Sequence, residues 1–168
     1  MLVEKIYFDM DDVLADFTRG VKEMVGMTPP PQDGKHKAED NDMWAGIRKI
    51  EHFYDKLEIA PGAKEMFDAL YDKYGNKCEV LTAVPKEDKN IPEAGEDKIK
   101  WMHRMLSEDI KINVVTREEK PGYCFGLGCI LIDDMEKNIK NWEEIGGTGV
   151  LHKSAEETML KLKEMGVL

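Results

Sequence analysis

The sequence is poor in the residues that build disulfide frameworks and zinc sites. Its 168 residues include only three cysteines, Cys78, Cys124 and Cys129, and no two of them form a CxxC pair. A disulfide-stapled domain needs an even set of cysteines, and a zinc site needs Cys or His ligands at short spacing. We therefore expect three reduced thiols that are partly buried.

Long apolar runs and clusters of positive charge are also missing. The longest apolar stretches, around residues 80–81 and 129–132, are far shorter than a membrane-spanning helix, and residues 1–5 lack a signal-peptide pattern. With 24 basic and 34 acidic residues, the formal charge is −10, which argues against extended binding to the phosphates of nucleic acid. We expect a cytoplasmic protein that does not bind membranes.

The composition that is present suits a packed α/β domain. Hydrophobic residues make up 42% of the chain and charged residues 35%, which is too apolar for a disordered acidic tail. Segments typical of strands alternate with segments of helical spacing. The predicted strands span residues 3–8, 77–82, 112–116, 129–132 and 148–151, and the predicted helices span 13–27, 44–54, 62–74, 97–106, 138–145 and 154–165. This alternation predicts a doubly wound parallel sheet covered by helices on both faces.

Turn-forming residues mark several boundaries between these elements. Three prolines and a glycine make residues 28–42 the clearest loop, residues 85–95 form a polar loop, and residues 117–121 form a charged turn. Gly75 suits the end of the helix before it, and Ser154 suits the N-cap of the last helix.

Three of the predicted strands end in polar residues with chemical capacity. Asp9 and Asp11 follow the first strand, Thr82 ends the second, and Asp133 and Asp134 follow the fourth. In an open parallel sheet the carboxyl ends of the strands face one crevice, where ligands bind. These residues, although distant in the sequence, are therefore expected to be neighbours.

Several carboxylates at one edge raise each other's pKa unless a cation offsets their charge. Oxygen ligands without nearby His or Cys favour Mg²⁺ over zinc, and Mg²⁺ commonly takes a substrate phosphate as a further ligand. The alternative is structural: Asp residues commonly cap the helix that follows them, and Thr82 can be an ordinary strand residue.

Together, these residues resemble the motifs of the haloacid dehalogenase-like (HAD) phosphohydrolases. The resemblance rests on Asp9-Met10-Asp11, Leu81-Thr82, Lys98 and Ile132-Asp133-Asp134, in that order, and it covers nearly the whole chain. It implies a Rossmannoid α/β core of residues 1–15 and 60–168, with a small helical cap of residues 16–59 inserted after the first strand.

The resemblance also implies the chemistry of a phosphomonoesterase that works through an aspartyl-phosphate. Asp9 would attack phosphorus, and Asp11 would protonate the leaving oxygen and later take a proton from water. Thr82 would hydrogen-bond a phosphoryl oxygen, and Lys98 would offset its negative charge.

The same resemblance implies a bound Mg²⁺. Its ligands would be Asp9, the backbone carbonyl of Asp11, and a carboxylate of Asp133 or Asp134.

Within this superfamily, residues 9–17, D-M-D-D-V-L-A-D-F, are similar to the D-x-D-G-V-L-A-D-F of the 5'(3')-deoxyribonucleotidases. Residues 42–63, 98–101 and 115–120 are similar to other segments of that family. The resemblance implies hydrolysis of nucleoside monophosphates, with an aromatic wall for the base and polar groups near the phosphate or sugar. The implied substrate-binding residues are Phe17, Trp44, Ala83, Lys86, Arg117 and Lys120. The aromatic residues of the cap can equally be its core.

The sequence departs from that family at three places, one of which is the separation of Arg117 and Lys120 by two residues where the family usually has one. Asp12 stands where the family usually has Gly, which adds a negative charge beside the phosphate site. The cap is short and is interrupted by Pro29–Pro31, so its pocket is either open or completed by a second chain in a homodimer. Two other functions stay open: the same chemistry on another small phosphate, such as a sugar phosphate or a nucleic-acid 3'-phosphate end, and a catalytically silent module that holds nucleotide.

Overall fold

The computed structural model describes all 168 residues, and a five-stranded parallel sheet forms its centre. The strands lie in the order β3-β2-β1-β4-β5, and every neighbouring pair is parallel. They are β1 (Lys5–Phe8), β2 (Cys78–Ala83), β3 (Lys111–Val115), β4 (Cys129–Asp133) and β5 (Thr148–Leu151). The predicted doubly wound parallel sheet is confirmed.

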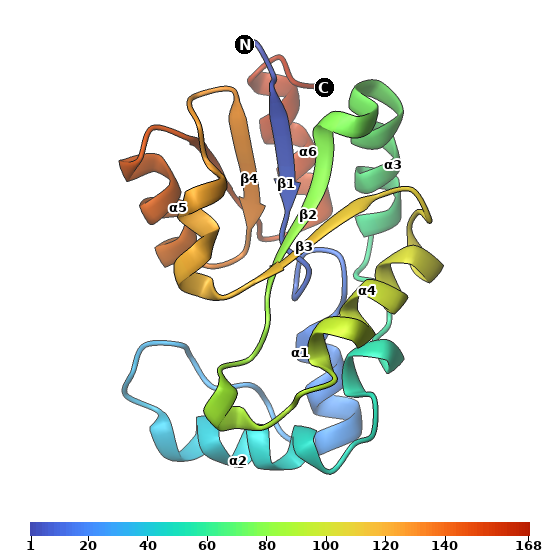
Figure 1. Ribbon diagram of the computed structural model, residues 1–168, viewed down its shortest axis with the longest axis vertical. Helices are drawn as coiled ribbons and strands as arrows, with labels where there is room; N and C mark the ends of the chain where they lie inside the picture. Colours follow the sequence, from blue (N-terminus) through green and yellow to red (C-terminus); the bar gives the residue numbers. More distant parts are fainter.

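Helices cover both faces of this sheet (Figure 1). On one face lie α3 (Ala63–Tyr74), α4 (Ala94–Met105) and α6 (Ala155–Glu164), and on the other lie α5 (Glu136–Glu144) and the 3₁₀ segment η5 (Arg117–Tyr123). Side chains of a strand alternate between the faces. Ile6 and Phe8 of β1 accordingly join the larger core with α3 and α6, whereas Tyr7 packs edge-on against Trp142 of α5.

A helical cap lies beyond the carboxyl ends of the strands, at the opposite end of the molecule from both termini (Figure 1). It consists of α1 (Phe17–Gly20), the π-helix η1 (Val21–Val25), α2 (Lys37–Arg48) and the 3₁₀ turn η2 (Phe53–Lys56). An antiparallel bridge pairs Ala15 with Ile59, where the chain leaves the sheet and returns to it. The short η4 (Glu87–Lys89), between β2 and α4, lies beside α2, and η3 (Gly75–Lys77) precedes β2.

The prediction of a continuous helix over residues 13–27 is wrong at its start. The amides of residues 13–15 all donate to the carbonyl of Met10, at 2.9 to 3.2 Å, and form a tight turn instead. Asp12 has a left-handed backbone, with φ 57°, which no α-helix accommodates. The helical part therefore begins only at Phe17 and continues as a π-helix.

The boundaries of the loop and helix within the cap also differ from the predicted ones. The loop predicted over residues 28–42 ends at His36, because α2 begins at Lys37, with Glu39 and Asp40 favourably placed in its first turn. The helix predicted over residues 44–54 ends at Arg48, and His52, with φ 54°, separates it from η2. The polar loop after β2 is shorter than predicted, and the charged turn after β3 extends into η5.

The remaining elements agree with the predicted ones to within a few residues. Gly75 ends α3 with φ 52°, a conformation that glycine adopts without strain, and the Ser154 hydroxyl accepts a hydrogen bond from the Glu157 amide at the start of α6. None of the helices has the length and apolar character that crossing a membrane requires.

Close packing within the cap yields a first prediction. A Cβ atom at Gly46 of α2 would overlap the side chain of Val25 in η1. Gly46→Ala should therefore lower the free energy of unfolding by about 1–3 kcal/mol, although Ala favours helix, because the β-branched Val25 has little room to move. Urea denaturation measures this effect. Gly122→Ala, where a Cβ meets no atom within 4 Å, is the control and should change stability by less than about 0.5 kcal/mol.

Candidate active site

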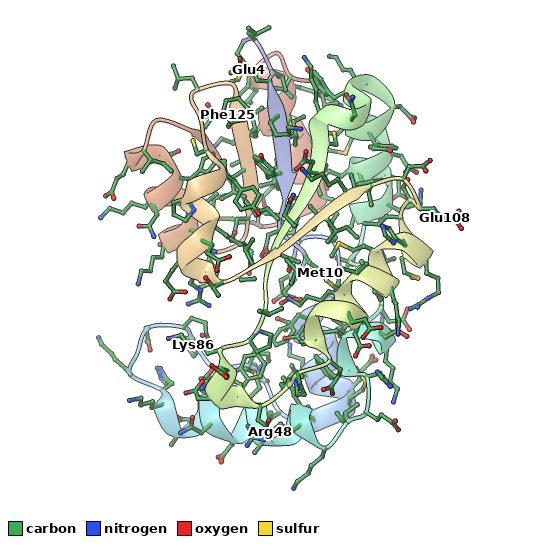
Figure 2. All side chains as sticks on the ribbon, in the orientation of Figure 1. Glu4, Met10, Arg48, Lys86, Glu108 and Phe125 are labelled. Carbon is green, nitrogen blue, oxygen red and sulfur yellow. The ribbon has the colours of Figure 1, made fainter.

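Three carboxylates meet where β1 and β4 end. Asp9 directly follows β1, and its amide donates to the carbonyl of Ile132 at 2.9 Å, which aligns the two strand ends. Asp133 is the last residue of β4, and Asp134 follows it. Each of the three offers a carboxylate oxygen within 4.8 Å of the others. In Figure 2, Met10 marks this level of the molecule, between the sheet and the cap.

The buried ammonium of Lys120 lies between two of these carboxylates. Its Nζ donates to Asp9 Oδ1 at 2.9 Å and to Asp133 Oδ2 at 2.8 Å. Burial alone would lower the pKa of Lys120, but the two carboxylates outweigh burial and raise the pKa above its usual range. Lys120 is therefore charged. It has a third N–H that makes no hydrogen bond within the chain.

Asp133 is held in one orientation by the start of α5. Its Oδ1 accepts the amide of Met135 at 2.9 Å, and its Oδ2 accepts Nδ2 of Asn138, also at 2.9 Å, in addition to Lys120. These contacts fix the carboxylate before any ligand arrives, as expected of a preorganised site.

Asp134 has no hydrogen-bond partner among the residues of the chain. Burial, followed by the charges of Asp9 and Asp133, raises its pKa to about 9. One lysine thus faces three carboxyl groups, and without a further cation Asp134 keeps its proton at neutral pH. An all-oxygen set with unbalanced charge fits a hard divalent cation such as Mg²⁺.

A second charged cluster lies at the end of β2. Lys98 of α4 is completely buried, and its Nζ donates to Asp11 Oδ2 at 3.0 Å, to Thr82 Oγ1 at 3.1 Å and to the carbonyl of Ala83 at 2.8 Å. These three acceptors occupy all three N–H groups of the ammonium. The aromatic ring of Tyr54 covers it, with the ring centroid 4.6 Å from Nζ.

Asp11 is therefore bonded through one carboxylate oxygen only. Burial raises its pKa, an effect that the Lys98 ammonium opposes. The other oxygen, Oδ1, is the one buried side-chain polar atom of the protein without a hydrogen-bond partner. An unpaired buried oxygen is costly, and such atoms often mark a functional site.

Asp12 makes no hydrogen bond to either cluster. Its carboxylate accepts the amide of Thr18 at 2.8 Å and the hydroxyl of Thr18 at 2.7 Å, and so caps the start of the cap helix. The carboxylate is thus hydrogen-bonded within the cap, but it also lines the cleft beside Asp134, and its charge helps to raise the pKa of Asp134. The left-handed backbone at this position explains why glycine suits it, and Asp is among the few other residues that tolerate it.

The aromatic residues of the cap form one cluster. Phe17 lies 6.3 Å from Trp44, 5.8 Å from Phe53 and 6.2 Å from Tyr54, measured between ring centroids. Phe53 and Tyr54 are buried, whereas Phe17 and Trp44 are partly exposed. The two residues predicted to bind the base are thus neighbours at the border of the cap's core.

A cleft of about 410 Å³ adjoins Asp134. Its walls are mainly polar and include Asp12, Asp16, His152 and Lys153, whereas Phe17 and Trp44 do not line it. His152 is buried, its Nδ1 lies 2.8 Å from the Thr158 hydroxyl, and burial lowers its pKa. The sequence offered no motif that would have singled out this histidine.

The remaining predicted residues form no ion pair with the carboxylates or act differently from expectation. Lys86 and Arg117 are exposed and make no ion pair, and Lys86 lies on the connection beside the cap (Figure 2). Lys120, expected only near phosphate or sugar, contacts Asp9 directly, whereas Lys98 contacts Asp11. Lys120 was singled out by the resemblance of residues 115–120 to the deoxyribonucleotidase family.

Comparison with solved structures identifies the fold. The chain is similar to a HAD-superfamily hydrolase from Ehrlichia chaffeensis, with a TM-score of 0.57 and 14% sequence identity, over 98% of both chains. It is also similar to the L-2-haloacid dehalogenase from Xanthobacter autotrophicus, with a TM-score of 0.55 and 9% identity, over 99% of this chain and 85% of that one. The protein has the fold of the HAD-superfamily hydrolases.

Comparison of sequences identifies a distant relative. No protein-family profile matches the chain. A protein of Vibrio phage KVP40, named "Putative 5'(3')-deoxyribonucleotidase", is 26% identical over 133 residues, which are 79% of this chain and 67% of the relative. The resemblance indicated by the motifs is therefore found by an independent comparison.

The role of Asp12 can be tested by its effect on stability. Asp12→Ala removes both hydrogen bonds to Thr18 and leaves a non-glycine residue at φ 57°. The free energy of unfolding should therefore fall by about 2 kcal/mol. Asp12→Asn keeps an acceptor for the Thr18 amide and tolerates the backbone, so its loss should stay below about 1 kcal/mol. Chemical denaturation of both variants measures the difference, and equal losses would refute the capping role.

Proposed function

We propose that the protein is a Mg²⁺-dependent phosphomonoesterase that works through an aspartyl-phosphate. The observation that carries the proposal is the pairing of two clusters at one edge of the sheet. In one cluster the Asp9 carboxylate lies beside the Lys120 ammonium. In the other, the Asp11 carboxylate is hydrogen-bonded through Oδ2 while Oδ1 has no partner. A nucleophile and a proton donor two residues apart suit phosphoryl transfer.

In the first step, Asp9 attacks the phosphorus of the substrate. Its Oδ1 accepts a hydrogen bond from Lys120, which leaves Oδ2 for the new P–O bond. The ester P–O bond breaks, and the leaving oxygen takes a proton from Asp11 and departs as an alcohol. The free N–H of Lys120 donates to a phosphoryl oxygen, so we assign to Lys120 part of the charge compensation that the motif pattern placed on Lys98.

In the second step, water attacks the phosphorus of the aspartyl-phosphate. Asp11 accepts the proton of the attacking water, the bond between phosphorus and Asp9 breaks, and phosphate leaves with Asp9 regenerated. Lys98 keeps Asp11 and Thr82 in place throughout, because its ammonium binds both.

Asp9, Asp133 and Asp134, with the backbone carbonyl of Asp11, would hold the Mg²⁺. The bound ion would supply positive charge that draws the phosphate to the carboxylates and stabilises the transition state. This ligand set also explains why the protein tolerates an unpaired carboxylate at Asp134.

The proposed substrate is a nucleoside monophosphate. The proposal is supported by the partly exposed Phe17 and Trp44, since aromatic rings stack on any nucleobase, and by the relative from Vibrio phage KVP40. The polar cleft beside Asp134 favours a second candidate, a small polar phosphate such as a sugar phosphate, because polar walls suit hydroxyl groups better than a base.

The mechanism predicts the effect of removing the nucleophile. Asp9→Asn should lower phosphate release in the presence of Mg²⁺ by roughly 10³-fold or more, because an amide oxygen does not form the intermediate. Chelation of the metal should abolish release by the native protein. Turnover that survives either change would contradict the aspartyl-phosphate mechanism.

The substrate class is tested by comparing the hydrolysis rates of two panels of phosphate esters. Deoxyribonucleoside and ribonucleoside monophosphates should be hydrolysed faster than sugar phosphates. Trp44→Ala should raise KM for the nucleotides by roughly 10-fold while leaving sugar phosphates unaffected, because base stacking contributes about 1–3 kcal/mol. Faster turnover of sugar phosphates, or equal effects of Trp44→Ala on both panels, would favour the second candidate.

A further inference from the structure

Tyr54 links the aromatic cluster of the cap with the Lys98 cluster. Its ring stacks on Phe17, at 6.2 Å and an interplanar angle of 24°, and packs edge-on against Phe53 at 5.3 Å. The Lys98 ammonium lies over the same ring, 4.6 Å from its centroid. Contacts on several sides of the ring therefore fix its position and orientation.

Helix α4 anchors the turn that carries Tyr54. Asp97 accepts His52 Nδ1 at 3.0 and 3.1 Å, one residue before η2 begins. Trp101 Nε1 donates to the carbonyl of Leu57 at 2.8 Å, and Arg104 donates to the carbonyl of Asp55 at 2.7 Å. Three positions along α4 thus hold η2, and Lys98 on the same helix lies under the ring. Tyr54 is positioned as firmly as a core residue.

The hydroxyl group of Tyr54 is not used by the protein. No hydrogen bond joins it to another residue, although the residue as a whole is only 1% exposed. Asp11 Oδ1 is the one fully enclosed polar side-chain atom without a partner, so the Tyr54 hydroxyl keeps a small exposed area although the residue is almost completely buried. A well-fixed ring beside Lys98 therefore carries a hydroxyl group that has no partner within the protein.

The ring of Tyr54 contacts the Lys98 ammonium that binds Asp11, and its hydroxyl is a hydrogen-bond donor. Burial, followed by the charges of Asp11 and then Asp9, raises the pKa of Tyr54 well above its usual value. The phenol therefore keeps its proton at any working pH. Asp11 Oδ1, the atom without a partner, and the Tyr54 hydroxyl are thus a free acceptor and a free donor in the same site.

We propose that the Tyr54 hydroxyl binds the substrate, donating a hydrogen bond to the ester oxygen of the phosphomonoester on the side where Asp11 delivers its proton. This inference rests on the proposed phosphomonoesterase function. Negative charge grows on the ester oxygen as the P–O bond breaks, so a fixed donor there stabilises the transition state more than the bound substrate. The cap would thereby contribute directly to the reaction.

The test removes only the hydroxyl group. Tyr54→Phe keeps the ring, its stack on Phe17 and its contact with Lys98, so its melting temperature should match that of the native protein. Tyr71→Phe is the matched control, because Tyr71 also stacks on a phenylalanine, Phe67, and its hydroxyl makes no hydrogen bond. Rates with Mg²⁺ are compared on a nucleoside monophosphate and on p-nitrophenyl phosphate.

Comparison of the two esters distinguishes the loss of a hydrogen bond to the ester oxygen from a general loss of activity. For the nucleoside monophosphate, whose leaving alkoxide is strongly basic, Tyr54→Phe should lower kcat/KM by roughly 10- to 100-fold. For p-nitrophenyl phosphate, whose leaving group is stable as an anion, the loss should stay below about threefold. Tyr71→Phe should match the native protein on both.

Two results would overturn the inference while leaving the proposed function intact. One is an unchanged kcat/KM of Tyr54→Phe on both esters, and the other is an equal loss on both, which would indicate an effect through Lys98 or Thr82 instead. If the native protein hydrolysed neither ester, the proposed function would fail, and the inference would fail with it.

Discussion

The contact of one buried ammonium with two carboxylates is the constraint on which the rest of the structure depends. Lys120 comes from the segment after β3, Asp9 from the end of β1 and Asp133 from the end of β4, so their meeting fixes three separate parts of the chain. A buried charge is tolerated only when it is paired and hydrogen-bonded. Because one ammonium cannot offset three carboxylates, the pKa of Asp134 is raised, and a cation together with a phosphate is the natural complement to this arrangement.

The parallel sheet turns this constraint into two clusters with different tasks. The β1–β4 border carries the carboxylates that suit a metal and a nucleophile, whereas β2 and α4 carry Thr82 and Lys98, which hold Asp11. Asp9 and Asp11 are only two residues apart, yet each belongs to a different cluster, because the tight turn at Met10 separates them. The cap completes the arrangement, since its turn η2 is anchored on the same helix that supplies Lys98.

Much of the fold and the core of the site could be predicted from the sequence, because apolar periodicity and strand-terminal carboxylates are local signals. The boundaries in the cap could not, since they depend on left-handed residues such as His52 and on the turn at Met10, which tertiary contacts impose. The direct contact of Lys120 with Asp9 was missed for a similar reason. Which lysine reaches which carboxylate depends on how the 3₁₀ turn η5 and the helix α4 aim their side chains, and spacing in the sequence does not record that direction.

The central claim is that Asp9 carries the phosphoryl group during turnover. The most direct measurement is rapid acid quenching of the protein with Mg²⁺ and a nucleoside monophosphate, followed by mass spectrometry of its peptides. The account predicts that the peptide containing Asp9 gains the mass of one phosphoryl group and that this group is located on Asp9. A phosphoryl group on any other residue, or steady release of phosphate with an unmodified Asp9 at every quench time, would contradict it.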